Sequence, residues 1–353
     1  APDAAAYESY WSKDHVYHQS PTGANTILPG YSEGEIVIEA MEPTVEQGKF
    51  INDRALTPFL NFADVSAGEK RRTVVLVRTS DFSGYYIDIF RSDQEDNDYL
   101  FHNVGTGLVL TDVKGYQLPV IPSDKFDKTY HPGYAWFTNL RKVDYNQDFI
   151  ATWTMPENIT TRLWMTGADG REIYQADAPA TTLNRGLTPG NVSTPPSFTP
   201  TLIVRQEGNN AKTEPFIAVY EAFKNNTPQV DQVAAVPVKG NCTGVRIRVG
   251  NNRDDYLFSA TDSQVYTPVS RSSFCGTLGL ISEQEGKVQS MYLGKGRLIK
   301  RGNYSIKAER EVYATIYQKN GEWFYSATGP VNIKIGKMHK TLNEGYDKRL
   351  NIK

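Results

Sequence analysis

Hydrophobic and polar residues alternate with a period of two along most of the chain, which is the pattern of half-buried β-strands. Glu35-Ile36-Val37-Ile38-Glu39 is the plainest example. Similar segments recur throughout the chain: 73–78 (TVVLVR), 85–90 (YYIDIF), 149–153 (FIATW), 161–165 (TRLWM), 201–206 (TLIVRQ), 215–223 (PFIAVYEAF), 244–250 (GVRIRVG), 304–309 (YSIKAE) and 331–336 (VNIKIG). No segment has a sustained helical period with capping residues. The best short-helix candidate is 50–62, and Pro58 interrupts it.

Two turn signals join neighbouring strand patterns. Asp169-Gly170 lies between LWMTGA and REIYQA, and Asn320-Gly321 lies between VYATIYQK and EWFYSA. Both dipeptides are typical of two-residue β-hairpins. The sequence therefore predicts a hairpin at each place.

Many short strands separated by turn residues predict an all-β fold, in the form of a large antiparallel β-sandwich without a helical domain. The strands are too numerous for one ordinary two-sheet module, so stacked large sheets are expected. The stretch 184–200 (NRGLTPGNVSTPPSFTP) predicts a surface loop. We therefore expect residues 1–183 to form the first part of the sandwich and 201–353 the second.

Composition narrows the class of protein. The 353 residues are 39% hydrophobic and 22% charged, as expected for a folded globular chain. Aromatic residues reach 12%, which suits β-structure and also suits stacking against sugar rings. For any single aromatic residue, a place in the core is the favoured interpretation. The net charge of −2 does not favour a nucleic-acid partner, and no apolar run is long enough for a membrane span.

The sequence contains two cysteines, Cys242 and Cys275, and neither lies in a metal-binding pattern. A disulfide between neighbouring strands and two buried thiols are both open. A secreted or periplasmic protein is compatible with either.

The segment 7–30 combines aromatic and polar side chains. It contains Tyr10, Trp11, His15, His18 and Asn25. In a strand, positions 15 and 18 face opposite sides, so the two histidines would not share a metal without a bend. The segment is interpreted either as the edge of a binding cleft with His or Tyr as acid or base, or as an ordinary polar loop. The residue pattern alone favours the loop.

A strongly acidic stretch, 91–98 (RSDQEDND), precedes the segment Tyr99-Leu100-Phe101-His102. Four carboxylates within six residues suggest Ca²⁺, but the spacing is not that of an EF-hand loop. A solvated hairpin loop is the favoured prediction. The sequence also contains no nucleophile-elbow, phosphate-loop, dinucleotide-binding or HExxH pattern.

Several fragments together resemble one family. Residues 20–30 (SPTGANTILPG) are similar to a segment of that family in which an "HNT" triplet precedes a strand. Residues 73–105 are similar to the family's next segment. They contain an arginine-bearing strand, then the pattern Y-x-x-D-x-F-R, then a polar turn and an aromatic strand. The series continues with 151–153 (ATW), 163–165 (LWM), 178–179 (AP), 202–205 (LIVR) and 216–221 (FIAVYE). In order and spacing it resembles the C-terminal β-sheet region of heparinase II/III-like and oligo-alginate lyases over nearly the whole chain.

The resemblance implies β-elimination on an acidic, uronic-acid-containing polysaccharide such as a glycosaminoglycan or alginate, in a periplasmic or secreted protein. Members of the family also carry an N-terminal helical toroid, which supplies much of the acid–base chemistry. Nothing in this chain corresponds to the toroid, so we expect it upstream or on a separate piece. The chain alone is therefore expected to be inactive or nearly so.

Few of the family's site residues match by position. Tyr10 is the candidate for the catalytic tyrosine, and Trp11, His15, His18 and Asn25 are candidates for substrate binding. Ala24 stands where many members have a zinc-binding histidine, so no metal cofactor is expected. His102 fits an "H-G" position of the family for which no catalytic role is implied. The alternative interpretation is a non-catalytic carbohydrate-binding or structural β-sandwich protein.

Overall fold

The structure is a computed structural model that describes residues 17, 20–29, 44–47, 50–51, 54–126, 132–180, 198–250 and 252–351. Strands make up 63% of these residues and helical turns 5%. The sheets are antiparallel, and the longest helical element among the described residues has five residues. The predicted antiparallel β-sandwich fold is confirmed, and the described part of the chain contains no helical toroid.

The chain divides into two compact units by its internal contacts. Unit 1 comprises Ala1–Thr44, Val65–Arg72 and Asp88–Pro228; unit 2 comprises Val45–Asp64, Thr73–Ile87 and Gln229–Lys353. The last change of unit, between Pro228 and Gln229, comes later in the chain than the loop expected at 184–200. Residues 184–197 of that loop lie outside the described residues, and Phe198–Pro200 begin a strand.

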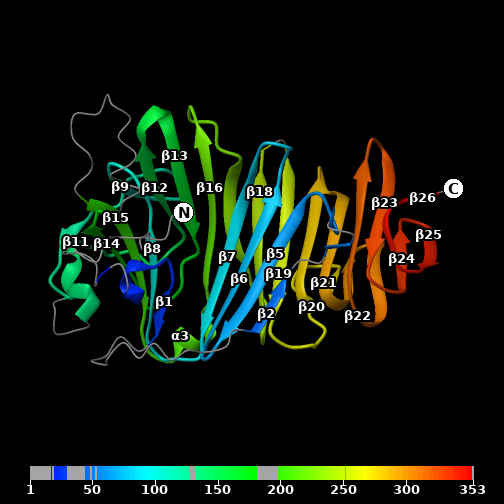
Figure 1. Ribbon diagram of the computed structural model, residues 1–353, viewed down its shortest axis with the longest axis horizontal. Helices are drawn as coiled ribbons and strands as arrows, with labels where there is room; N and C mark the ends of the chain where they lie inside the picture. Colours follow the sequence, from blue (N-terminus) through cyan, green and yellow to red (C-terminus); the bar gives the residue numbers. More distant parts are fainter. Residues whose placement is uncertain are drawn as a thin grey trace. The chain divides into compact units, whose positions relative to one another are not determined.

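The strands of the described residues form four sheets. Figure 1 labels most of these strands. In sheet order, the six-stranded sheet contains β1 (Ile27–Pro29), β8 (Asn97–His102), β15 (Phe198–Gln206), β14 (Arg171–Pro179), β11 (Thr138–Val143) and β10 (Ile121–Pro122). The eight-stranded sheet contains β2 (Thr44–Gln47), β5 (Leu60–Ala67), β6 (Lys70–Arg78), β7 (Gly84–Ser92), β16 (Phe216–Lys224), β13 (Ile159–Met165), β12 (Phe149–Met155) and β9 (Leu108–Asp112).

The largest sheet has ten strands and lies in unit 2. It contains β17 (Val230–Val236), β18 (Cys242–Val249), β19 (Arg253–Ala260), β20 (Ser272–Gln284), β21 (Lys287–Arg301), β22 (Tyr304–Lys319), β23 (Glu322–Ala327) and β26 (Gly345–Leu350), with β24 (Val331–Ile335) on β22 and β25 (Met338–Leu342) on β24. A two-stranded sheet pairs β3 (Phe50–Ile51) with β4 (Arg54–Ala55). The short helical elements that lie wholly within the described residues are η1 (Pro21–Gly23), η2 (Pro132–Trp136), η3 (Pro156–Asn158) and α3 (Asn210–Thr213).

Unit 1 is a sandwich of the six-stranded sheet and part of the eight-stranded sheet. One core contains side chains from both sheets, among them Phe101 of β8, Trp153 of β12 and Phe216 of β16. The Trp153 indole Nε1 donates to the Pro200 carbonyl at 3.0 Å, so this buried polar atom has a partner. The two inner faces thus enclose apolar side chains, as expected for packed sheets.

The outer face of the six-stranded sheet, which bears Asp98, Leu100 and His102, is also covered. Tyr17, Phe126 and the η2 region pack over it in a second apolar cluster. Here Phe126 lies 4.9 Å from Tyr134 between ring centroids, and Tyr17 lies 6.1 Å from Phe137. The face therefore packs against chain segments of unit 1.

In unit 2, the residues of β5 and β7 contact the ten-stranded sheet. Phe62 lies 6.1 Å from Tyr292 between ring centroids, and the Tyr85 hydroxyl donates to Asp255 at 2.5 Å. The ten-stranded sheet also lines a core of its own with side chains from β18 to β26. Register shifts after Cys275 in β20 and around Gly296 in β21 interrupt its long strands. Such bulges let a strand bend so that one face of the sheet encloses a core.

Several strand predictions are confirmed, whereas the helix candidate and one of the two expected hairpins are wrong. The patterns at 73–78, 85–90, 149–153 and 161–165 lie within β6, β7, β12 and β13. The segment Glu35–Glu39 lies outside the described residues. The helix candidate at 50–62 is wrong, because its described residues form strand segments β3, β4 and the start of β5.

Of the two expected hairpins, one is confirmed. Lys319 pairs with Glu322, and Asn320 and Gly321 both have positive φ, at 53° and 77°, as the tight turn requires. Asp169-Gly170 instead connects β13 and β14, which belong to different sheets. That prediction is wrong because a turn signal does not reveal whether the chain re-enters the same sheet.

The two cysteines, Cys242 and Cys275, are buried free thiols. The alternative of a disulfide between neighbouring strands is therefore not the one that the structure has.

Candidate functional site

Strand β8 places alternate residues on opposite faces of the six-stranded sheet. Tyr99 and Phe101 enter the core of the unit 1 sandwich, while Leu100 belongs to the cluster on the outer face. With a period of two, Asp98 and His102 share the outer face with Leu100. Two polar residues therefore stand on a covered, otherwise apolar surface, and each needs partners.

His102 is held by two residues from the segment before β1. Its Nε2 lies 2.8 Å from the Tyr17 hydroxyl, and its Nδ1 lies 3.1 Å from Asn25 Oδ1. Tyr17 and His102 are both 0% exposed. The Phe137 ring stacks on the imidazole at 6.3 Å between centroids and also contacts Tyr17. The imidazole is thus fixed on both nitrogens and on one face.

The direction of the Tyr17–His102 hydrogen bond depends on where the imidazole carries its protons. In the neutral imidazole with the proton on Nδ1, the Tyr17 hydroxyl donates to Nε2. In the imidazolium, both ring nitrogens donate, and the Tyr17 hydroxyl can instead donate to the Thr22 carbonyl, 3.1 Å away. In either direction of the Tyr17–His102 hydrogen bond, the tyrosine hydroxyl therefore has an acceptor within reach.

Asn25 joins this pair to the rest of unit 1. Its Oδ1 accepts from the His102 backbone N–H at 2.5 Å, and its Nδ2 donates to the His102 carbonyl at 3.2 Å. Arg72 of β6 donates to the Asn25 carbonyl at 2.8 Å and forms a bidentate pair with Asp88, with distances of 2.9 and 2.8 Å. Burial alone would lower the pKa of Arg72, but the Asp88 carboxylate raises it, so the guanidinium stays charged. Asn25 is thereby positioned by an ion pair.

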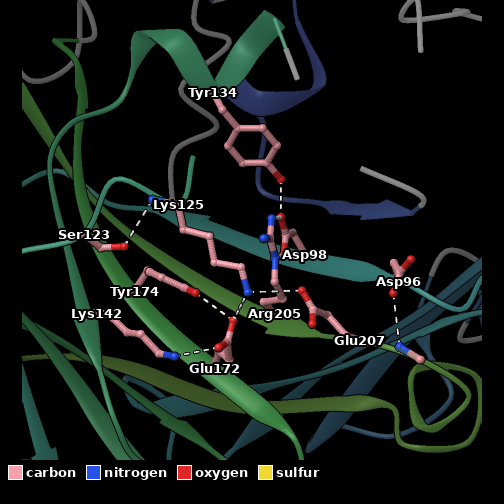
Figure 2. A network of polar contacts seen from close by, with 11 residues as sticks. Asp96, Asp98, Ser123, Lys125, Tyr134, Lys142, Glu172, Tyr174, Arg205 and Glu207 are labelled. Carbon is pink, nitrogen blue, oxygen red and sulfur yellow. Dashed lines mark hydrogen bonds and ion pairs between the residues drawn. The ribbon is translucent and has the colours of Figure 1, made fainter. Parts of the chain in front are cut away.

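A second polar group lies four residues away on the same face, around Asp98. Arg205, its cross-strand neighbour on β15, donates from Nε at 2.8 Å and from a terminal nitrogen at 2.6 Å. Figure 2 shows the Tyr134 hydroxyl reaching the same carboxylate from the η2 segment. Asp98 and Arg205 side chains are both 0% exposed. The stretch 91–98, expected to be a solvated loop, therefore ends in a strand with a buried ion pair.

The polar network continues along β14 and β11. Glu172 accepts from Lys125 and Lys142, each at 2.6 Å, and from Tyr174 at 2.7 Å (Figure 2). Burial opposes ionisation of Glu172, but these hydrogen bonds outweigh it and lower its pKa to about 2. Lys125 also pairs with Glu207 at 3.2 Å. This network fixes the segment before η2 to the sheet.

A tyrosine in hydrogen-bond contact with a histidine is suited to proton transfer. In this site, however, both side chains are buried and their polar atoms are bound within the chain. The arrangement therefore anchors the Tyr17–Asn25 segment to β8.

The predicted site residues divide into two groups. Tyr10, Trp11, His15 and His18 lie outside the described residues, so their roles stay predictions. Asn25 is described, and its side chain is engaged with His102. Tyr17 was not singled out from the sequence. Its only local signal was its place in a segment rich in tyrosine and histidine, because the partner His102 is 85 residues away.

No group of three or more potential metal ligands occurs among the described residues. Ala24 follows η1, and its backbone N–H donates to the Pro21 carbonyl. Its methyl group offers no donor atom. The expectation that no metal cofactor is bound stays a prediction.

Similarity to known proteins adds to this geometry. Residues 230–318 match the family described as the endo-acting ulvan lyase C-terminal domain. Over 269 residues the chain is 28% identical to an endo-acting ulvan lyase of Formosa agariphila. These matches support a C-terminal β region of a polysaccharide lyase. The aligned part covers 68% of this chain and 31% of that protein, so it spans about a third of the relative's length.

A weaker likeness is to the crystal structure of heparan sulfate lyase HepC from Pedobacter heparinus. The TM-score is 0.41 and the identity 10%, covering 76% of this chain and 34% of that chain. A likeness at this level assigns neither fold nor function. Among the described residues, no helix is long and apolar enough to cross a membrane.

Proposed function

We propose that this chain is the C-terminal β region of a lyase that cleaves a uronic-acid-containing polysaccharide by β-elimination. The observation that carries the proposal is the match to an endo-acting ulvan lyase over 269 residues. An ulvan-like acidic polysaccharide is the first substrate to test. A periplasmic or secreted location follows from a polymeric substrate, and cell fractionation with an antibody to the protein tests it; recovery in the cytoplasm would contradict it.

β-Elimination makes three chemical demands. The uronate carboxylate must be neutralised, a base must remove the adjacent ring proton, and an acid must protonate the leaving oxygen. In this proposal Tyr10 supplies one proton-transfer group, and Trp11, His15 and His18 line the substrate, whereas Asn25 is engaged with His102. The Tyr17–His102–Asn25 cluster acts as a positioning device, since its polar atoms are engaged within the chain.

The remaining groups are proposed to come from a helical toroid, upstream or on a separate piece. Elimination leaves an unsaturated uronate that absorbs ultraviolet light, so turnover is followed directly. We expect the isolated chain to yield no product from ulvan, alginate or heparin, whereas the natural protein with any upstream region yields product from at least one. Turnover by the isolated chain at a comparable rate would contradict the need for a further region.

A second candidate function is a non-catalytic carbohydrate-binding protein. The burial of Tyr17 and His102 favours it, because neither side chain reaches solvent in this chain. Binding of the same polysaccharides by the natural protein, with no unsaturated product under any condition, would select this alternative.

A further inference from the structure

The charge of the chain is concentrated at its C-terminal end. From residue 287 onward there are 14 Lys and Arg residues against 5 Asp and Glu, a formal net charge of +9 in a chain whose total is −2. This part contains β21 to β26 of the ten-stranded sheet. A basic surface in an otherwise acidic chain favours an anionic partner there.

Strand register places three of these lysines on one face. Lys300 of β21 pairs with Ser305 of β22, and Ser305 pairs with Lys334 of β24. Directly paired residues point to the same side of a sheet. Lys307 is two residues beyond Ser305 in β22, so it shares that side. We call Lys300, Lys307 and Lys334 the lysine face.

The other side of these strands is buried. Ile299, Ile306 and Ile333 pair in one row across the same three strands and belong to the core of unit 2. The lysine face therefore points away from that core. Lys300 and Lys307 are exposed and Lys334 is partly buried.

These lysines differ from the arginines of the same sheet. Arg246, Arg253 and Arg301 each pair with a carboxylate within 3.0 Å. Lys300, Lys307 and Lys334 form no ion pair with any residue in the described part of unit 2. Their ammonium groups are thus available to an external anion, although Glu309 follows Lys307 two residues later.

The neighbours of the lysine face are small and polar. Ser273 pairs with Lys300, Asn332 pairs with Lys307, and Thr341 pairs with Asn332. His339 of β25 pairs with Lys334 and extends the row. With strands about 4.8 Å apart, Lys300 and Lys334 stand roughly 10 Å from each other across the sheet. Spaced cations among hydroxyl and amide groups suit a polymer that carries both acid groups and hydroxyls.

We infer that the lysine face binds the acidic polysaccharide itself, as a contact of unit 2 with the polymer. This inference rests on the proposed function for the identity of the polymer. The charge and the polar neighbours together favour a polysaccharide over a partner recognised by apolar contact. The surface holds the chain through several weak, salt-sensitive contacts.

The test uses the natural protein and a triple variant, Lys300→Gln, Lys307→Gln and Lys334→Gln. A matched control, Lys114→Gln, Lys224→Gln and Lys239→Gln, removes the same charge from exposed lysines outside the basic C-terminal part. Binding to ulvan is measured by titration calorimetry at low and at physiological salt. We expect the face variant to lose about tenfold in affinity at low salt and the control to lose less than about twofold.

Two further readouts separate this inference from the proposed function. Turnover of short oligosaccharides should be unchanged in the face variant, while turnover of dilute polymer falls with its affinity. Unchanged polymer affinity in the face variant, or an equal loss in the control, would overturn the inference even if the lyase reaction is observed. Tighter binding of single-stranded DNA than of ulvan at the same salt would also overturn it. Absence of unsaturated product from every substrate would contradict the proposed function instead.

Discussion

Two buried tyrosines close the outer face of the six-stranded sheet, each by a hydrogen bond to a polar residue of β8. Tyr17 contacts His102, and Tyr134 contacts Asp98. Both come from segments outside the sheet, so each contact fixes a connecting segment to a strand. At the residue scale, the site is therefore stabilised by satisfying polar groups that the fold has buried.

The contact of Tyr17 with His102 should contribute measurably to stability. In Tyr17→Phe the hydroxyl is lost, and with it the 2.8 Å hydrogen bond to Nε2 of the buried His102. We expect a loss of about 1–3 kcal/mol in the free energy of unfolding, measured by urea titration. Tyr116→Phe, at a side chain that is 71% exposed, is the control and should change stability by less than about 0.5 kcal/mol. Equal effects of the two substitutions would contradict the contact.

Breaking the ion pair between Asp98 and Arg205 should lower the stability of the protein, because the buried carboxylate then loses its cationic partner. Arg205→Met leaves the carboxylate without its guanidinium, and we expect a loss of about 3–5 kcal/mol. Adding Asp98→Leu should recover part of this loss, because the unpaired charge is then absent. Lys224→Gln, which breaks an exposed pair with Glu157, should cost at most about 1 kcal/mol. A double variant no more stable than Arg205→Met would argue against this explanation.

The pKa of Glu172 predicts an acid-sensitive contribution to stability. Its pKa is about 2 in the folded protein against an ordinary 4.5, so the folded state binds the proton less readily than the unfolded state. The stabilisation is therefore complete above pH 4.5 and is lost as the pH falls toward 2. Because the side chain is partly solvated, we expect about 1–2 kcal/mol. Glu172→Gln should flatten the pH dependence of unfolding in that range, and an unchanged slope would exclude the carboxylate as its source.

At the scale of elements, close approach between strands β20 and β21 depends on glycine. Gly276 and Gly296 pair directly, and a Cβ at Gly296 would lie 2.6 Å from the Cys275 carbonyl oxygen. We expect Gly296→Ala to lower the free energy of unfolding by about 1–3 kcal/mol through overpacking. Gly250→Ala, where a Cβ meets no atom within 4 Å, is the control and should be nearly neutral. Thermal unfolding of both variants measures the difference, and equal melting temperatures would refute it.

The sequence predicted strands well and their partners poorly. The alternation of hydrophobic and polar residues identified β6, β7, β12 and β13, because each of these strands has one face in a core. The sequence also predicted the Asn320-Gly321 turn correctly, because the two strands that flank it pair with each other. Asp169-Gly170 has the same local signal, yet its flanking strands lie in different sheets. Sheet membership depends on contacts distant in sequence, which no local pattern encodes.

The candidate site illustrates the same limit. The segment 7–30 was identified from its aromatic and polar residues, and Asn25 does lie in the polar cluster. Its partner His102 is 77 residues away and reaches it only because β1 pairs with β8. Asp98 was predicted to lie in a solvated loop. The acidic run around it does not indicate that Arg205 pairs with it on the neighbouring strand.

At the scale of the whole molecule, the chain supplies two β units and about a third of the length of its ulvan lyase relative. Unit 1 contains Tyr17 and Asn25, which are anchored to His102 of β8. Unit 2 contains the matched C-terminal domain family and the lysine face. In the proposed function these units position the substrate and contact the polymer, and a further region supplies the remaining chemistry.

The most direct test of this account is the chemistry of the cleaved product. The natural protein is incubated with ulvan, and ultraviolet absorbance is followed together with the appearance of new reducing ends. We expect both to rise together, because elimination forms one unsaturated uronate for each bond broken. New reducing ends without a rise in absorbance would indicate hydrolysis and contradict the assignment to a lyase.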